Sequence, residues 1–151
     1  MNPATGEAIA ALSCAGTSEA LNAADRAFAV WRTTTAVQRW EILGRAASLI
    51  DEPKESISKV LTIENGKTLS EAFGELGSCV DAIRWYAEEG KRAYGRVIPS
   101  RHPAVRQPVV KEPVGSALGF AAWNFPAGNV TLKIAAALAA GWPTATKKKK
   151  K

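Results

Sequence analysis

Apolar residues recur at the spacing of an α-helix through residues 17–90, with polar residues at the positions between them. Residues three and four apart lie on one side of a helix, so each repeat predicts a helix with a single buried face. The pattern predicts four such helices, which begin near Thr17 or Ser18, near Ala36, at Pro53 and at Thr68. The fourth is the longest and should end near Gly90 or Gly95.

Local signals mark the ends of these helices. Pro53 suits the first turn of the third helix, because that position needs no backbone donor. Asn65-Gly66 should end this helix, since glycine readily adopts the left-handed conformation that follows a helix. Thr68 and Glu71 have the spacing of a capping box, in which each side chain satisfies a free backbone amide. We therefore expect the longest helix to begin at Thr68.

The periodicity changes after Gly95. Residues 97–99 and 105–114 are rich in β-branched residues but are interrupted by prolines. Each proline removes a backbone donor, which confines such segments to edge strands or a ribbon. We therefore expect a ribbon between the helical half and the rest of the chain.

The last part of the chain has the order of a parallel unit. Residues 115–122 form a short apolar run that predicts a buried strand, and residues 123–129 read as a loop. A helix of small residues at 130–140 and a strand from 143–146 follow. Strand, helix and strand in this order predict a βαβ unit with a parallel sheet. The expected fold class is therefore α/β.

Composition is typical of a single globular domain. The 151 residues are 46% hydrophobic and 23% charged, which argues against disorder. The net charge of +6 comes mainly from the lysine run at 147–151, without which 15 basic residues face 14 acidic ones. Five adjacent lysines predict only weak, salt-sensitive attraction to polyanions, so we expect no specific nucleic-acid partner.

Several other classes are excluded or disfavoured by what the chain contains. No apolar stretch approaches the roughly 18 residues that span a bilayer, and no convincing export signal is present, so a cytoplasmic protein without a membrane partner is expected. His102 is the single histidine, which excludes a zinc site built from several histidines within this chain, and no Ser-His-Asp triad is expected. Cys14 and Cys79 are isolated and form no metal-binding spacing, so no metal site is expected.

A set of short motifs resembles one enzyme family. Trp-Asn-Phe-Pro at 123–126 follows the expected strand, and Leu-Lys-Ile-Ala-Ala-Ala-Leu-Ala-Ala-Gly follows at 132–141. This pair looks like the NAD(P)-dependent aldehyde dehydrogenases, and further phrases agree in order at residues 2–7, 61–67, 71–75, 85–90 and 111–115. The combination is most similar to the succinate-semialdehyde dehydrogenase branch. The resemblance implies a helical segment and β-ribbon leading into the first βαβ unit of an incomplete Rossmann-like cofactor-binding domain.

The resemblance also implies roles for three residues. Asn124 matches the asparagine that stabilises the oxyanion formed from the aldehyde, Trp123 the position that lines the cofactor cleft, and Lys147 the lysine that binds the adenosine ribose. NAD or NADP is the implied cofactor, a small aldehyde the substrate, and a homo-oligomer the implied full-length form. Each residue also has a simpler interpretation: an Asx-turn for Asn124, a packing role for Trp123 and a solvated tail for Lys147.

The chain departs from the family pattern near its end. Lys148 stands in place of the family's proline, Lys150 in place of an acidic residue, and Trp142 where a small or polar residue is usual. The family's catalytic cysteine and glutamate segments have no counterpart in the 151 residues. We therefore expect residues 1–146 to be the N-terminal part of the cofactor-binding domain. Residues 147–151 are expected to be an artefact or a truncation scar.

Three functional hypotheses follow. The first is the N-terminal piece of an aldehyde dehydrogenase that oxidises succinate semialdehyde or another small aldehyde, inactive as this chain alone. The second is a non-enzymatic remnant that associates with full-length subunits through exposed apolar surface. The third, a polyanion binder acting through its lysine tail, has the least support, because no interleaved aromatic residues or basic helix accompany the lysines.

Overall fold

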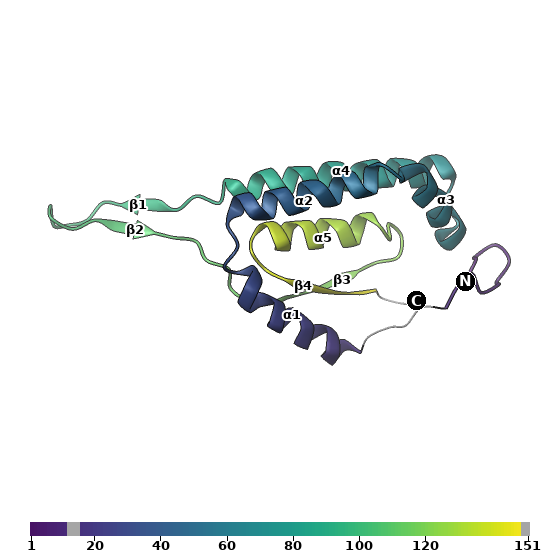
Figure 1. The fold of residues 1–151 in the computed structure, drawn as a ribbon, viewed down its shortest axis with the longest axis horizontal. Helices are drawn as coiled ribbons and strands as arrows, with labels where there is room; N and C mark the ends of the chain where they lie inside the picture. The colour runs from purple at the N-terminus through teal and green to yellow at the C-terminus, as the bar shows by residue number, and fades with distance from the viewer. Residues whose placement is uncertain (12–15, 149–151) are drawn as a thin grey trace.

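The computed structural model of the protein describes residues 1–11 and 16–148 (Figure 1). The helices and strands are α1 (Thr17–Trp31), α2 (Ala36–Asp51), α3 (Lys54–Asn65), α4 (Leu69–Lys91), β1 (Arg96–Ile98), β2 (Gln107–Val109), β3 (Ala117–Ala121), α5 (Gly128–Ala139) and β4 (Thr144–Lys148). The helical first half, the ribbon and the βαβ unit are all confirmed.

The predicted helix ends are found where the local signals place them. Thr68 caps α4: its Oγ1 accepts a hydrogen bond from the Glu71 amide over 3.2 Å, and Glu71 Oε2 accepts one from the Thr68 amide over 3.0 Å. Gly66 follows α3 with a φ of 83°, the left-handed conformation that favours glycine. Pro53 lies one position earlier than expected, because it is the N-cap residue of α3.

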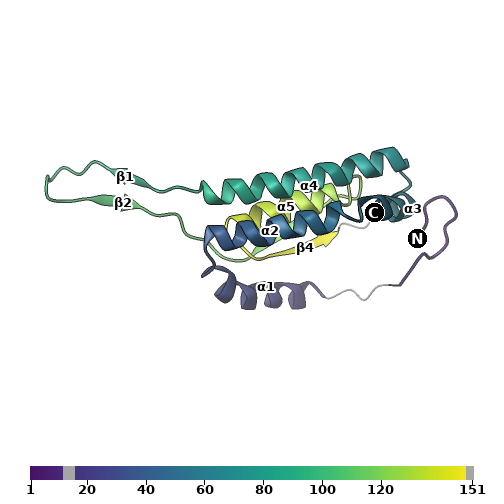
Figure 2. The same ribbon diagram turned by 45° about the horizontal axis from the view of Figure 1, so that its top comes forward.

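The ribbon extends away from the rest of the protein (Figures 1 and 2). β1 and β2 are antiparallel, and Val97 lies opposite Pro108. Every residue of both strands is exposed. The ribbon therefore contributes nothing to the core of the described residues.

β3 and β4 pair in parallel, and α5 connects them. The register places Ala117 opposite Thr144 and Ala121 opposite Lys148. The backbone of the first two lysines of the run at 147–151 thus extends β4, while the assignment of that run as a separate tail stays a prediction.

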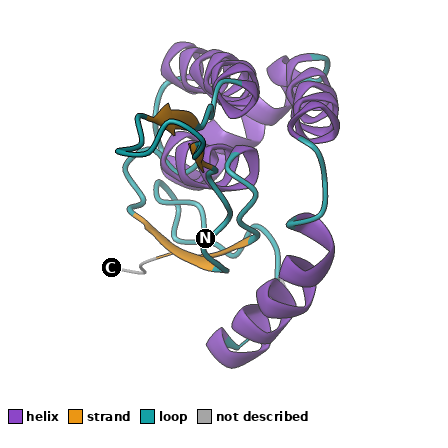
Figure 3. Ribbon diagram, turned by 90° about the vertical axis from the view of Figure 1, so that its left-hand side faces the viewer, coloured by secondary structure: helices purple, strands orange, loops and turns teal. Residues whose placement is uncertain are grey.

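The elements stack in layers (Figure 3). α2 and α4 lie side by side on the outer surface of α5, the β3–β4 sheet lies beneath α5, and α1 lies on the far side of the sheet (Figures 1 and 2). The main core forms where α2, α4 and α5 meet, and its buried residues are Leu43, Ala47, Val80, Ile83, Ala87, Ala135 and Ala139. Small alanines at these positions allow the three helices to approach closely.

The expectation that residues 115–122 form a buried strand is confirmed for one face of β3 and wrong for the other. Ala121 is buried, but Leu118 is 38% exposed and Phe120 is 62% exposed. Alternate residues of a strand face opposite sides, so one face of β3 packs under α5 while Leu118 and Phe120 occupy the other. No helix among residues 1–11 and 16–148 is long and apolar enough to cross a membrane.

Candidate functional site

The carboxyl ends of β3 and β4 meet at one edge of the sheet, because the strands are parallel and Ala121 pairs with Lys148. The loop of residues 122–127 leaves β3 at this edge and leads into α5 (Figure 1). Trp123 is half-buried in the loop, and the backbone of Lys147 lies opposite Phe120. Ligands of open α/β sheets bind outside the carboxyl ends of the strands. The two expected cofactor-binding residues therefore belong to neighbouring segments at such an edge.

Asn124 is exposed on this loop, and a second asparagine orients its side chain. Asn129 Nδ2 donates to Asn124 Oδ1 over 3.1 Å and to the carbonyl oxygen of Ala122 over 3.4 Å. Since the Oδ1 of Asn124 accepts this bond, the amide's donor group points elsewhere. Asn124 Nδ2 donates to no other residue in the part of the chain that the structure describes. It is therefore available to an oxygen that gains negative charge.

Two side chains, one from the last residue of α3 and one from the connection to α4, hold the backbone of the loop. Asn65 Nδ2 donates to the carbonyl oxygen of Trp123 over 2.9 Å. Lys67 Nζ donates to the carbonyl oxygen of Asn124 over 3.3 Å. The backbone of the residues expected to contact cofactor and substrate is thus held by side chains nearly sixty positions earlier in the chain.

A buried carboxylate holds the other end of the loop. Glu75 Oε1 accepts hydrogen bonds from the backbone amides of Ala127, over 2.9 Å, and Gly128, over 2.8 Å. Its second oxygen, Oε2, accepts from Lys67 Nζ. The Glu75 side chain is only 2% exposed and that of Lys67 10%. The first free amides of α5 are therefore satisfied by α4.

Sequence patterns alone leave these supporting residues without a role. Asn65 is recognisable only as part of a helix stop, and the patterns assign no function to Lys67, Glu75 or Asn129. Glu75 carried a detectable signal, because a carboxylate lies among the apolar positions of the predicted helix at 69–87. Such a residue is rarely buried without a partner.

A groove of about 410 Å³ lies beside the loop, between α4 and α5. Its lining includes Glu75, Ser78 and Cys79 from α4, and Phe125, Asn129 and Leu132 from the other side. Asn129 thus contacts Asn124 and also borders the groove. The volume suits a small organic molecule.

Cys79 lacks the features of a catalytic thiol. It is 2% exposed, and burial raises the pKa of its thiol, an effect that a hydrogen bond with Thr131 partly opposes. A raised pKa lowers the fraction of reactive thiolate near neutral pH. Cys14 lies outside the described residues. Among the described residues, no group of histidine, cysteine, aspartate and glutamate side chains is arranged to hold a metal ion.

Comparison with known proteins places the whole chain in one family. Residues 1–150 match the aldehyde dehydrogenase family. The chain is 45% identical to the 3-sulfolactaldehyde dehydrogenase of Pseudomonas putida over 143 residues, covering 93% of this chain and 29% of that protein. It is 41% identical to the NADP(+) succinate-semialdehyde dehydrogenase of Escherichia coli over the same length, covering 30% of that protein. The chain thus spans about three-tenths of the length of these relatives.

Solved structures agree with this assignment. The succinate-semialdehyde dehydrogenase of Burkholderia pseudomallei superposes with a TM-score of 0.91 at 41% identity, covering 97% of this chain and 31% of that one. A betaine aldehyde dehydrogenase variant from Staphylococcus aureus in complex with NAD+ superposes with a TM-score of 0.91 at 31% identity, covering 98% of this chain and 31% of that one. The fold matches the N-terminal part of these enzymes, and the chain belongs to the aldehyde dehydrogenase family.

Proposed function

We propose that this chain supplies the oxyanion-stabilising loop and part of the nucleotide-binding sheet of an NAD(P)-dependent aldehyde dehydrogenase. The reaction is oxidation of a small aldehyde to the carboxylic acid, with succinate semialdehyde as the proposed substrate. The observation that carries the proposal is the Nδ2 group of Asn124, which donates to no residue within 1–11 and 16–148 and belongs to a loop at the sheet edge whose backbone Lys67 holds. The similarity to enzymes named for succinate semialdehyde supports the choice of substrate.

Asn124 would act when a nucleophile adds to the aldehyde carbon and the carbonyl oxygen gains negative charge. Its neutral amide donates a hydrogen bond that strengthens as this charge develops, which lowers the barrier more than it stabilises the bound aldehyde. Asn129 engages Asn124 Oδ1, which leaves the donor group directed away from Asn129. The rest of the substrate would lie in the groove between α4 and α5.

The sheet edge fits a dinucleotide, because two parallel strands end there side by side. Trp123 and Lys147 are the residues that we propose hold it. A dinucleotide held there would supply a nicotinamide ring as the hydride acceptor for the oxidation. The N-terminal amides of α5 already bond to Glu75, so the dinucleotide's phosphates must be held by other groups.

The 151-residue chain alone should not oxidise aldehydes. The route needs a thiolate nucleophile and a base, and the buried Cys79 with its raised pKa does not serve as the first. A second candidate, a non-enzymatic form that associates with full-length subunits, is favoured by the exposed apolar side chains of Leu118 and Phe120 on β3.

The test is a hybrid enzyme in which residues 1–148 replace the matching segment of the Burkholderia pseudomallei succinate-semialdehyde dehydrogenase. The hybrid should oxidise succinate semialdehyde and reduce NAD or NADP. Asn124→Ala should lower kcat by about 100- to 1,000-fold, the usual cost of losing one oxyanion donor. Asn22→Ala, the same change at an exposed position of α1, is the matched control and should leave kcat unchanged.

Absorbance of the reduced nicotinamide measures turnover, and gel filtration with circular dichroism shows whether the hybrid is folded. A folded hybrid without turnover, or full activity after Asn124→Ala, would contradict the proposal. Turnover with another small aldehyde, but none with succinate semialdehyde, would overturn the substrate and keep the role of Asn124.

A further inference from the structure

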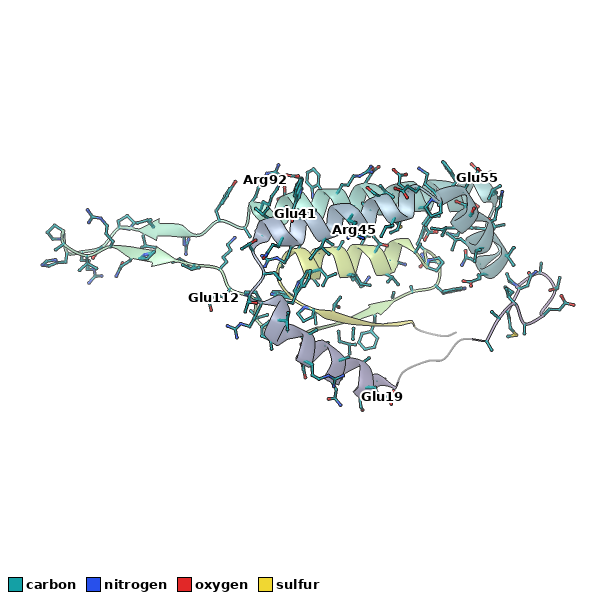
Figure 4. The ribbon with its side chains drawn as sticks, in the orientation of Figure 1. Glu19, Glu41, Arg45, Glu55, Arg92 and Glu112 are labelled. Atoms are coloured by element: carbon teal, nitrogen blue, oxygen red, sulfur yellow. The ribbon has the colours of Figure 1, made fainter. Side chains whose placement is uncertain are left out.

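Glu75 is unusual among the acidic side chains of this protein. Glu19, Glu41, Glu55 and Glu112 are exposed and lie at the surface of the molecule (Figure 4). The Glu75 side chain is 2% exposed, within the contact between α4 and the start of α5. Burying a carboxylate is costly unless a cation and hydrogen-bond donors compensate it. The position therefore requires the partners that surround it.

Those partners fully engage the carboxylate. One oxygen accepts from the amides of Ala127 and Gly128, and the other accepts from Lys67. Ala127 is the N-cap residue of α5 and has no side-chain cap of its own. Glu75 thus supplies the missing cap from another helix and places a negative charge at the positive end of α5.

Lys67 extends the same contact to the other side of the loop. Its Nζ donates to Glu75 and to the carbonyl oxygen of Asn124. The Lys67–Glu75 pair therefore bonds to the loop at Asn124 and Ala127 and to the first residue of α5, Gly128. Asn129, which orients the Asn124 amide, lies one residue beyond Gly128. Both the backbone of Asn124 and the residue that orients its side chain depend on this pair.

We propose that Lys67 and Glu75 are positioning residues that hold the Asn124 amide in place for catalysis. The proposal rests on the proposed function, because it gives the pair a role in the step that Asn124 would assist. Neither side chain has to touch the substrate. An error of about 1 Å in the donor position is enough to reduce turnover strongly.

A purely structural role would make the pair no different from other contacts of α5. The opposite end of this helix provides the comparison, because Arg39 Nε donates to the carbonyl oxygen of Ala139 over 3.0 Å. Arg39→Met removes a charged contact from the same helix, at the end away from the loop. It is therefore the matched control for Glu75→Gln.

The first experiment measures amide hydrogen exchange in the 151-residue chain and needs no turnover. Glu75→Gln should speed exchange at Ala127 and Gly128 by about tenfold while the core amides of α4 stay protected. Arg39→Met should leave these two amides unchanged. If Glu75→Gln alone unfolds the chain, the double variant Lys67→Met/Glu75→Gln takes its place. It removes both buried charges and should speed exchange at the same two amides. Unchanged exchange, unprotected amides in the unaltered chain, or a uniform rise across α4 would overturn the proposal.

The second experiment uses the hybrid enzyme to measure the effect of Glu75 on catalysis. Glu75→Gln should lower kcat by about tenfold and change the KM for the nucleotide by less than about twofold. Arg39→Met should leave kcat unchanged, even where it lowers the melting temperature. Equal losses of kcat in the two variants would overturn the positioning role. A folded but inactive unaltered hybrid would instead overturn the proposed function, and the exchange result would still stand.

Discussion

At the residue scale, the orientation of one amide depends on a single neighbouring side chain. Asn129 Nδ2 bonds to Asn124 Oδ1 over 3.1 Å, and both groups are accessible from solvent or the groove. A hydrogen bond of this kind contributes about 0.5–1.5 kcal/mol. Under the proposed function, this bond matters less for stability than for the direction of the Asn124 Nδ2 group.

This contact gives a testable coupling. Asn129→Ala should lower kcat of the hybrid enzyme by about two- to tenfold, because the Asn124 amide loses its fixed orientation. The double variant Asn124→Ala/Asn129→Ala should be no slower than Asn124→Ala, since Asn129 acts through Asn124. Steady-state measurement of kcat for the two single variants and the double variant completes this double-mutant cycle. Independent, multiplying losses would show that Asn129 acts in another way.

Cys79 provides the second prediction at this scale. Burial raises the pKa of its thiol, so the thiolate should form only above the pH range of an exposed cysteine. Alkylation of Cys79 by iodoacetamide at pH 8 should therefore be at least about tenfold slower in the folded chain than in the chain unfolded by urea. Peptide mass spectrometry follows the rate. Rapid labelling of the folded protein would contradict the raised pKa and would make Cys79 a candidate for a catalytic thiol.

At the element scale, the helices form where short-range signals place them, and α4 is the clearest example. Thr68 and Glu71 satisfy each other's backbone amides at its start. Thr68→Ala should lower the free energy of unfolding by about 1 kcal/mol, the usual cost of losing a threonine cap. Urea titration followed by circular dichroism measures it. Ser70→Ala, an exposed change in the same turn, is the control and should cost much less.

The same capping box should make stability depend on pH. Hydrogen bonds from Thr68, first from its side chain and then from its backbone, hold the pKa of Glu71 below its ordinary value of 4.5. A lowered pKa in the folded state means that the carboxylate stabilises the protein above 4.5 and that this contribution is lost in more acidic solution. The cost of Thr68→Ala should therefore shrink as the pH falls toward 3. A constant cost across this range would contradict this assignment.

These elements also show how far prediction from the sequence reaches. The capping box at Thr68, the stop at Gly66 and the strand–helix–strand order are local patterns, so the helices, the ribbon and the βαβ unit could be predicted. The resemblance of residues 123–126 located the loop. The support of that loop could not be predicted, because Glu75 bonds to amides 52 and 53 positions later in the chain. Periodicity shows that a face is buried, but it does not show against which element.

At the scale of the whole molecule, the layers leave much apolar surface open. The main core lies among α2, α4 and α5, while the β3–β4 sheet is covered by α5 on one side and contacted by α1 mainly at β4. Leu118 and Phe120 are exposed on β3, and Val97 is exposed on the ribbon. Exposed apolar side chains at such positions favour association with other chains. The sheet face and the ribbon are therefore the two surfaces expected to contact further protein.

The sheet face can be tested directly in the 151-residue chain. Phe120 is 62% exposed, so Phe120→Lys should remove apolar surface without opening a cavity and should lower self-association. Val60→Lys, at a 52% exposed position of α3, adds the same charge away from the sheet and is the control. Sedimentation velocity across a range of concentrations should show a higher monomer fraction for Phe120→Lys only. An equal gain from both variants would mean that net charge, rather than the β3 face, governs association. Unchanged association in both variants would mean that the β3 face does not govern self-association. The ribbon is then the surface to test, and Val97→Lys is the corresponding change.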